Sequence, residues 1–142
     1  MEIRSPETEK EFADYFHLRW KILRQPWQQP EGSEQDNEED TSYHIIAVEN
    51  NQIAGVARLQ SADKNQLQLR YMAVDHGFQG KGVGRKIMQH AESHARQQGY
   101  KAIILNAREN ALGFYLRLGY QQREKTCLLF DSIQHYKMHK TL

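Results

Sequence analysis

A cluster of glycines and basic residues near the middle of the chain has the composition of an anion-binding site. Four of the nine glycines fall within the eight residues 77–84, and three lysines or arginines lie among them or directly after them. These seven residues are Gly77, Gly80, Lys81, Gly82, Gly84, Arg85 and Lys86. Glycine lets backbone N–H groups turn toward a ligand, and a helix start adds unpaired donors and a positive dipole end. We interpret the segment as a phosphate-binding loop, the plainer alternative being a tight turn with surface lysines.

Two common phosphate-binding motifs do not match this loop. The dinucleotide pattern G-x-G-x-x-G, counted from Gly80 and Gly82, requires a third glycine where Arg85 stands. The Walker pattern has the correct gap between Gly77 and Gly82, but it is not followed by the required Lys-Ser/Thr. The loop therefore predicts a different phosphate-bearing ligand.

The histidines do not form a recognisable metal motif. His90 and His94 share a helix face, but the pattern H-E-x-x-H needs its acid one position before Glu92. His135 and His139 share a strand face, and the pattern offers them no third ligand. The basic part of the chain also lacks a stripe of arginines interleaved with aromatic residues. We therefore predict neither a metal nor a nucleic-acid partner.

The loop must be positioned by a strand before it and a helix after it. Apolar spacing predicts a strand over 67–74, a helix over 82–98 and a second strand over 102–107, which together form a parallel crossover unit. The remaining predicted elements are a first strand near 2–5, a helix over 7–24, strands over 43–49 and 52–60, a helix over 111–118 capped by Asn110, and strands over 120–130 and 134–140. This pattern predicts one α+β domain over 1–142. Its mixed, mostly antiparallel sheet has a central parallel βαβ crossover and flanking helices.

Composition excludes several classes of protein. The chain has 142 residues, and no apolar run approaches the roughly 20 residues of a membrane span. Charged residues are spread over the first ten positions, of which they occupy five, unlike a secretory signal. The single cysteine, Cys127, has apolar neighbours, and we expect it to pack inside a strand. These features predict a cytoplasmic protein without a membrane partner.

The net charge of +1 conceals two oppositely charged parts. Residues 1–49 contain five Lys or Arg and twelve Asp or Glu, a net of −7. Residues 50–142 contain fourteen and six, a net of +8. Six of the acids lie in the predicted loop 31–40. A basic part suits an anionic ligand and an acidic part suits a cationic one, although both can also be solvated surfaces.

The glycine loop also reads as Q-x-x-G-x-G over residues 79–84, and F-Y-x-x-x-G-aromatic follows over residues 114–120. With the preceding strand that ends at Met72–Val74, these motifs resemble the GNAT superfamily of acyl-CoA-dependent N-acyltransferases. The resemblance extends over nearly the whole chain, from the first predicted strand to the last. It implies acetyl-CoA as the acyl donor.

The resemblance also implies roles for individual residues. The coenzyme pyrophosphate is expected on the loop backbone, the pantetheine arm along a bulged strand, and a tyrosine as general acid toward the leaving thiolate. The residues expected to bind the coenzyme are Met72, Ala73, Val74, Gln79, Gly80, Lys81, Gly82, Val83, Gly84, Arg85 and Asn106. The tyrosine that matches the motif is Tyr115, whose alternative role is a core aromatic.

Two positions depart from the family pattern. Arg108 stands where the family often has a coenzyme-contacting asparagine, so Asn106 or Asn110 would have to replace it. Gln68 stands where some members have a glutamate as general base. An alkylamine of pKa near 10.4 is neutral in about one molecule in 2,500 at pH 7, so a base is still needed. The candidate bases are His44, Glu49, Tyr71 and Asp75.

These observations predict an acetyl-CoA-dependent N-acetyltransferase in which a primary amine attacks the thioester directly. The acceptor is a small molecule or a peptide, and the acidic 31–40 loop favours a cationic one such as a polyamine, an aminosugar or a lysine-bearing peptide. The alternatives are a non-catalytic acyl-CoA-binding regulatory module and a transferase for a longer acyl chain. A monomer and a homodimer both fit the sequence.

Overall fold

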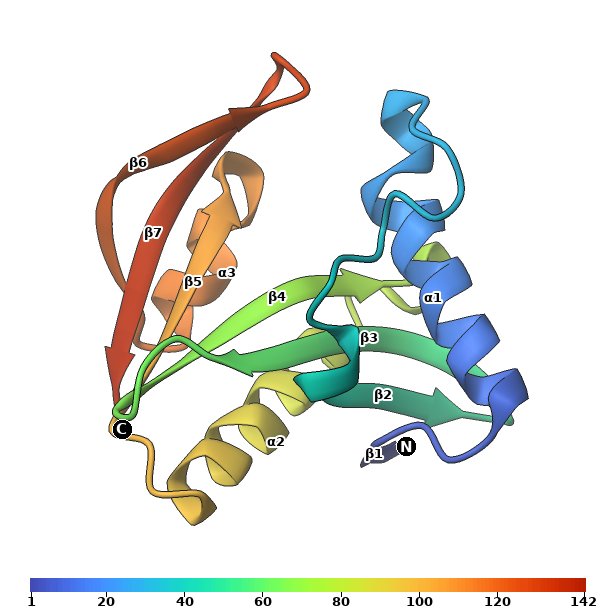
Figure 1. Cartoon of the computed structure of the whole chain (residues 1–142), viewed down its shortest axis with the longest axis horizontal. Coiled ribbons are helices and arrows are strands. Elements are labelled where there is room, and N and C mark those ends of the chain that lie inside the picture. Colours follow the sequence, from blue (N-terminus) through green and yellow to red (C-terminus); the bar gives the residue numbers. More distant parts are fainter. The chain divides into compact units, whose positions relative to one another are not determined.

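A computed structural model describes all 142 residues and has a mixed α+β architecture (Figure 1). The strands are β1 Glu2–Arg4, β2 Tyr43–Glu49, β3 Gln52–Ser61, β4 Gln66–Val74, β5 Ala102–Arg108, β6 Gln121–Leu129 and β7 Ile133–Thr141. The helices are α1 Glu9–Leu23, α2 Val83–Gln97 and α3 Leu112–Arg117, and the short 3-10 helices are η1 Gln25–Trp27, η2 Glu39–Thr41, η3 His76–Phe78 and η4 Glu109–Ala111. The strand order is β1-β2-β3-β4-β5-β7-β6. The parallel β4–β5 pair in a mostly antiparallel sheet confirms the predicted fold class.

The chain divides into two compact units. Unit 1 comprises Met1–Gln60 and Tyr71–Ala91, and unit 2 comprises Ser61–Arg70 and Glu92–Leu142. The division falls within β4 and α2, so each of these elements contributes residues to both units. The single domain over 1–142 stays a prediction. No helix is long and apolar enough to cross a bilayer.

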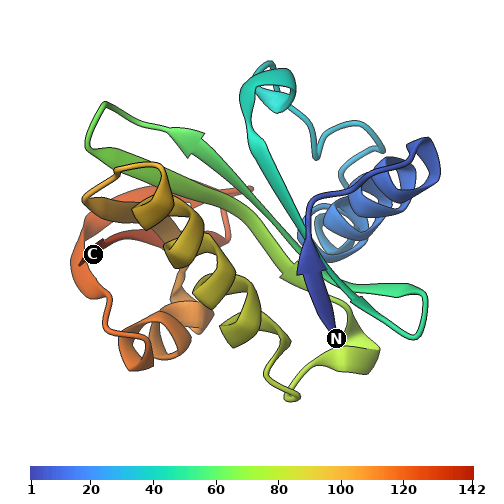
Figure 2. The same ribbon diagram turned by 90° about the horizontal axis from the view of Figure 1, so that it is seen from below.

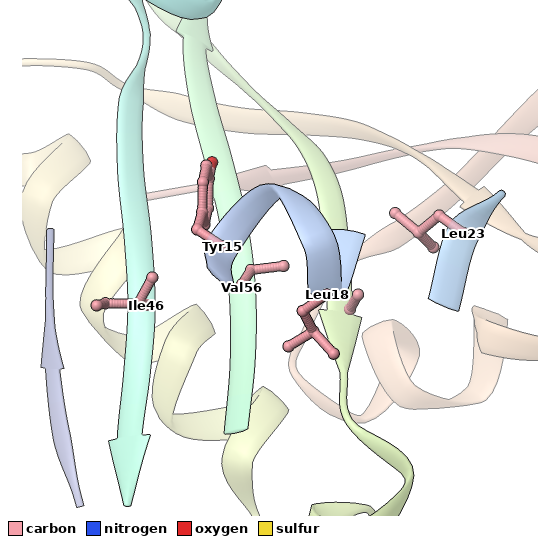
Figure 3. Packing of buried hydrophobic residues seen from close by; sticks show 6 residues of the cluster. Tyr15, Leu18, Leu23, Ile46 and Val56 are labelled. Carbon is pink, nitrogen blue, oxygen red and sulfur yellow. The ribbon is translucent and has the colours of Figure 1, made fainter. Parts of the chain in front are cut away.

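In unit 1, α1 packs its apolar face on the strands. Thr8 caps the helix, since its Oγ1 accepts a hydrogen bond from the N–H of Glu11 at 3.1 Å. Tyr15, Leu18 and Leu23 of α1 are buried in one cluster with Ile46 of β2, Val56 of β3 and Ala73 of β4 (Figure 3). The structure thus confirms the predicted amphipathic helix, with ends within two residues of those expected.

The N-terminal half of α2 packs on the opposite face of these strands (Figure 2). Successive strand residues point to opposite faces, so Gly55 faces α2 while Val56 faces α1. A Cβ at Gly55 would lie 2.8 Å from Ile87 Cδ1, 2.9 Å from Val83 Cγ1 and 3.2 Å from the carbonyl oxygen of Ala73. Glycine is therefore required there to bring α2, and the loop that precedes it, close to the sheet.

Gly55→Ala is expected to lower the free energy of unfolding by about 1–3 kcal/mol, because the added methyl group overpacks this contact. Urea denaturation measures the change. Gly77→Ala is the matched control, because its Cβ would have nothing within 4 Å, and we expect a change within about 0.5 kcal/mol. Equal stability of the two variants would contradict the close packing.

Unit 2 is built around β5. The first residues of β4 pair with β5 in parallel, from Gln66 with Ala102 to Leu69 with Leu105. On its other side β5 pairs antiparallel with β7. Flanked by two strands, β5 buries four of its five apolar residues, which confirms the predicted central strand: Ala102, Ile103, Leu105 and Ala107.

Two predictions about unit 2 are wrong. Cys127 is exposed rather than packed, because β6 is an edge strand paired with β7 and all its residues before Leu129 are exposed. Asn110 does not cap the third helix, because the chain turns through η4 first and the N-cap is Ala111, without a side-chain hydrogen bond. Apolar neighbours in the sequence therefore did not indicate burial of Cys127, and the residue type of Asn110 did not indicate a helix cap.

Candidate active site

The glycine loop of unit 1 has a backbone conformation that depends on two of its glycines. Gly80 and Gly82 have φ of 76° and 80°, in the left-handed region that favours glycine. A Cβ on either residue would meet nothing within 4 Å, so the backbone here is open. The carbonyl of Gly82 accepts from the N–H of Lys86 at 3.1 Å, which marks the first turn of α2. N–H groups in a first helical turn have no intrahelical acceptor and are suited to bind an anion.

The loop is tied to the end of β4. Gln79 Nε2 donates to the carbonyl of Val74 at 3.1 Å, and Asp75 caps η3 through the N–H of His76 at 2.8 Å. Lys81 lies over the ring of Phe78, with its Nζ 5.7 Å from the ring centroid, and is otherwise exposed. The loop thus starts from a fixed strand end and presents a basic side chain beside open backbone.

A backbone irregularity lies within β4, one residue before the segment 72–74 that the family resemblance implied to be bulged. Tyr71 has φ of 56°, a left-handed conformation that costs a non-glycine residue about 1–2 kcal/mol. Met72 and Val74, which follow it, are partly buried, and Ala73 is buried. The strand segment predicted to receive the pantetheine arm therefore follows directly on a residue that redirects the backbone.

Around Tyr71 the structure gathers charged residues that the sequence analysis did not connect. Arg19 of α1 and Arg58 of β3 are fully buried, and both bind Glu39 Oε2, at 2.9 and 2.7 Å. Arg58 also binds Asp36, with contacts of 2.7 and 3.0 Å. These hydrogen bonds hold the pKa of Asp36 well below its usual range. The sequence contained one signal of this charge cluster, because an arginine lies on the apolar face of α1 (Arg19) and another on that of β3 (Arg58).

This charge cluster changes the interpretation of the acidic loop 31–40. Asp36 and Glu39 point inward to the arginines, and Glu34 is buried with its carboxylate bonded to the N–H of Gly32 and the amide of Gln35. The exposed acids of the loop are Glu31, Glu38 and Asp40. Half of the negative charge expected to face an acceptor therefore has an internal partner.

A cavity of about 420 Å³ lies in unit 1 between α1 and the beginning of this loop. The residues that line it include three with aromatic side chains and two with carboxylates: Phe16, His17, Trp20, Glu31 and Glu34. The ring centroids of His17 and Trp20 are 5.7 Å apart, and Trp20 Nε1 donates to the carbonyl of Gln29 at 2.9 Å. Aromatic faces beside carboxylates are a chemical environment that favours an organic cation.

Tyr115 lies in α3 of unit 2 and is almost completely buried, with 6% of its surface exposed. Its ring packs edge-on against Phe114 and Tyr120, with centroids 4.9 and 5.8 Å apart. Tyr120 is anchored by its hydroxyl, which donates to Glu92 at 3.0 Å. Burial raises the pKa of Tyr115, so its hydroxyl stays protonated at neutral pH and is able to donate a proton.

The two candidate asparagines lie on different elements of unit 2. Asn106 is exposed in β5, opposite Lys137 of β7. Asn110 lies in η4, immediately before α3. Both stay predictions as coenzyme contacts.

The four candidate bases all have partners in unit 1. His44 donates from Nε2 to the carbonyl of Glu39 at 2.8 Å, so its Nδ1 accepts from the hydroxyl of Tyr15 at 2.7 Å. Both ring nitrogens are thus occupied, and burial lowers the pKa of His44. The other three candidates also have partners. Glu49 lies 3.3 Å from the N-terminal amine, Asp75 lies 3.0 Å from Lys21, and the hydroxyl of Tyr71 lies 3.2 Å from Asp36. None of the four is a free base in this arrangement.

In the first of the two histidine pairs, His90 contacts a tyrosine. His90 Nε2 lies 2.9 Å from the hydroxyl of Tyr43, and the two rings stack. The structure contains no group of three or more His, Cys, Asp or Glu side chains placed to hold a metal ion.

Comparisons with known proteins agree with the motifs and the fold. The family model of the acetyltransferase (GNAT) domain matches residues 13–142. An uncharacterized N-acetyltransferase of Bacillus subtilis (strain 168), YjcF, is 28% identical over 134 residues, covering 94% of this chain and 95% of that protein.

Solved structures show the same fold. An aminoglycoside 6'-N-acetyltransferase complexed with coenzyme A aligns with a TM-score of 0.82 at 16% identity, over 99% of this chain and 97% of that chain. A putative N-acetyltransferase from Lactobacillus plantarum aligns with a TM-score of 0.85 at 21% identity and the same coverage. With the family model matching most of its length, the chain belongs to the GNAT acetyltransferase family and is an acyltransferase that uses an acyl-CoA donor.

Proposed function

We propose that this acetyltransferase transfers the acetyl group of acetyl-CoA to a primary amine by direct attack on the thioester. The observation that carries this proposal is the open, left-handed backbone of Gly80 and Gly82 at the start of α2, in a chain of the GNAT family. In the proposed reaction the amine nitrogen bonds to the thioester carbon, the carbonyl oxygen carries the negative charge, and the carbon–sulfur bond then breaks. The products are an N-acetylated amine and coenzyme A.

The coenzyme would lie along the end of β4 and the glycine loop. The backbone from Gln79 to Arg85 would bind the pyrophosphate, with Lys81 and Arg85 adding positive charge. The backbone of Met72, Ala73 and Val74 would receive the pantetheine arm and supply an N–H to the developing oxyanion. Asn106 is a further proposed contact.

Tyr115 would protonate the departing thiolate as general acid. Burial raises the pKa of Tyr115, which keeps the hydroxyl protonated at neutral pH but also makes it a weaker acid, so the role rests on the match to the family motif rather than on the pKa. Since none of the four candidate bases is free, we propose that the amine loses its proton to water. The rate is then expected to rise with pH toward the pKa of the amine.

The acceptor is proposed to be cationic. The cavity beside α1 supports this proposal better than the net charge does, because it places aromatic and acidic residues around one space.

Glu31→Gln is expected to raise the KM for a diamine about three-fold and to leave acetyl-CoA binding unchanged, because Glu31 lines the cavity. Initial rates with a diamine measure the effect. Glu38→Gln is the matched control, because Glu38 is exposed but does not line the cavity. Equal KM values in both variants would contradict the assignment.

Thiol release from acetyl-CoA with a panel of amines and lysine peptides tests the proposed function. Amine-dependent release supports transfer to an amine. Binding of acetyl-CoA without release for any acceptor favours the non-catalytic acyl-CoA-binding module instead. Faster release from a longer acyl-CoA than from acetyl-CoA would favour the other alternative, a transferase for longer acyl chains.

A further inference from the structure

Tyr71 is unusual among the residues with left-handed backbone. Six residues other than glycine have positive φ. Five of them lie in turns between elements: Gln28, Asn50, Asn51, Phe130 and Asp131. Tyr71 alone lies inside a strand. A bulky aromatic residue adopts this conformation only where its surroundings hold it there, and such strain concentrates at functional sites.

The side chain of Tyr71 is held by three arginines and one carboxylate of unit 1. The guanidinium carbons of Arg19, Arg58 and Arg24 lie 4.3, 4.8 and 5.6 Å from the centroid of its ring. At the other end of the side chain, the hydroxyl donates to Asp36 Oδ2 at 3.2 Å. The ring is therefore fixed by cation–π contacts and by a hydrogen bond to a charged acceptor.

The carboxylate of Asp36 is itself held in place, so the hydroxyl of Tyr71 donates to an acceptor that does not move. Arg58 binds both oxygens of Asp36, and Glu39 accepts from the N–H of Asp36 at 3.1 Å. Glu39 also binds Arg19 of α1. The network connects α1, β3 and the loop before β2 to a single residue of β4.

Stability alone is a weak explanation for this network. A buried ion pair is often no more stable than well-packed apolar residues of similar volume, and its attested use is to specify one geometry. Arg19 and Arg58 are fully buried, and each leaves its Nε without a hydrogen-bond partner. The residue of β4 that this network contacts is Tyr71, whose backbone is left-handed.

We propose that Tyr71 and Asp36 are positioning residues that fix the left-handed turn of the β4 backbone at Tyr71, and so aim the backbone of Met72 and Ala73 at the acyl group of the donor. This inference rests on the proposed function, in which that backbone binds the thioester. Neither side chain is required to touch a reacting atom. Their effect is expected on the chemical step rather than on binding of the coenzyme, whose pyrophosphate lies on the glycine loop.

The first test removes only the hydroxyl of Tyr71. Tyr71→Phe is expected to lower kcat about five-fold and to leave the dissociation constant of coenzyme A within two-fold, because the ring stays between the arginines while its anchor is lost. Tyr43→Phe is the matched control, since it also loses a phenol hydrogen bond in a strand of unit 1, here to His90. An unchanged kcat in Tyr71→Phe, or an equal loss in Tyr43→Phe, would overturn the proposal.

A second pair of variants tests rescue at Asp36. Asp36→Asn keeps an oxygen that accepts from Tyr71, whereas Asp36→Ala does not. We expect kcat to fall less in the asparagine variant than in the alanine variant, with thermal unfolding used to select folded protein. If both variants lost the same activity, Asp36 would act through charge and folding, and its positioning role would be wrong.

Amide NMR provides a readout that does not depend on turnover. Addition of acetyl-CoA to the wild-type protein is expected to shift the ¹⁵N–¹H signals of Met72 and Ala73, and Tyr71→Phe is expected to reduce these shifts while those of Gly80 and Gly82 remain. Shifts at the glycine loop alone in the wild type would overturn the proposed placement of the pantetheine arm on β4, and this inference with it. Identical shifts in wild type and Tyr71→Phe would overturn the inference only.

Discussion

Tyr115→Phe is expected to lower kcat about 100-fold and to leave acetyl-CoA affinity unchanged. The substitution removes the proton donor proposed for the leaving thiolate, and general acid catalysis contributes roughly 10²–10⁴-fold. We expect the lower end, because a thiolate leaves more readily than an alkoxide even without protonation. Steady-state thiol release measures kcat, and equilibrium titration measures acetyl-CoA affinity.

Tyr120→Phe is the control, because it removes a phenol hydroxyl from a ring that packs against Tyr115. The ring of Tyr120 contacts that of Tyr115, but its hydroxyl already donates to Glu92. We expect Tyr120→Phe to lower the free energy of unfolding by about 1 kcal/mol and to retain most of the activity. If Tyr115→Phe kept wild-type kcat, Tyr115 would be the core aromatic of the alternative interpretation.

Gly82→Val is expected to weaken acetyl-CoA binding at least ten-fold. A β-branched residue cannot readily adopt φ of 80°, and its side chain would cover the open backbone proposed to bind the pyrophosphate. Isothermal titration with acetyl-CoA, and separately with coenzyme A, measures the loss. Both ligands should be affected equally, because they share the pyrophosphate.

Gly99→Val separates this effect from backbone strain. Gly99 follows α2 with φ of 84°, and a Cβ there would also meet nothing within 4 Å. Both variants should therefore lose similar stability, while only Gly82→Val loses coenzyme affinity. Wild-type affinity in Gly82→Val, or an equal loss in Gly99→Val, would show that the loop does not bind the coenzyme as proposed.

Local sequence patterns were sufficient to predict most of the fold. The stripe Val83, Ile87, Ala91 and Ala95 predicted one face of α2, and all four residues are buried. The glycines predicted a loop before that helix whose backbone N–H groups can turn toward a ligand, and two of the glycines have left-handed backbone there. Both signals lie within a few residues of the structure they specify.

The features that sequence patterns missed depend on residues far apart in the chain. The partners Arg19, Asp36 and Arg58 come from a helix, a loop and a strand, and no spacing rule relates them. The acidity of the 31–40 loop suggested exposed charge, although half of its acids point inward to such partners or to the loop itself. Cys127 had apolar neighbours, but its exposure follows from the position of β6 at the sheet edge. Pairing across the fold, rather than composition, decides these outcomes.

Mass analysis of an amine incubated with the protein and acetyl-CoA tests the central claim most directly. The account predicts an N-acetylated amine and one equivalent of free coenzyme A for each acetyl group transferred, at a rate that depends on both substrates. Recovery of intact acetyl-CoA and unmodified amine for every acceptor in the panel, despite measurable acetyl-CoA binding, would contradict it.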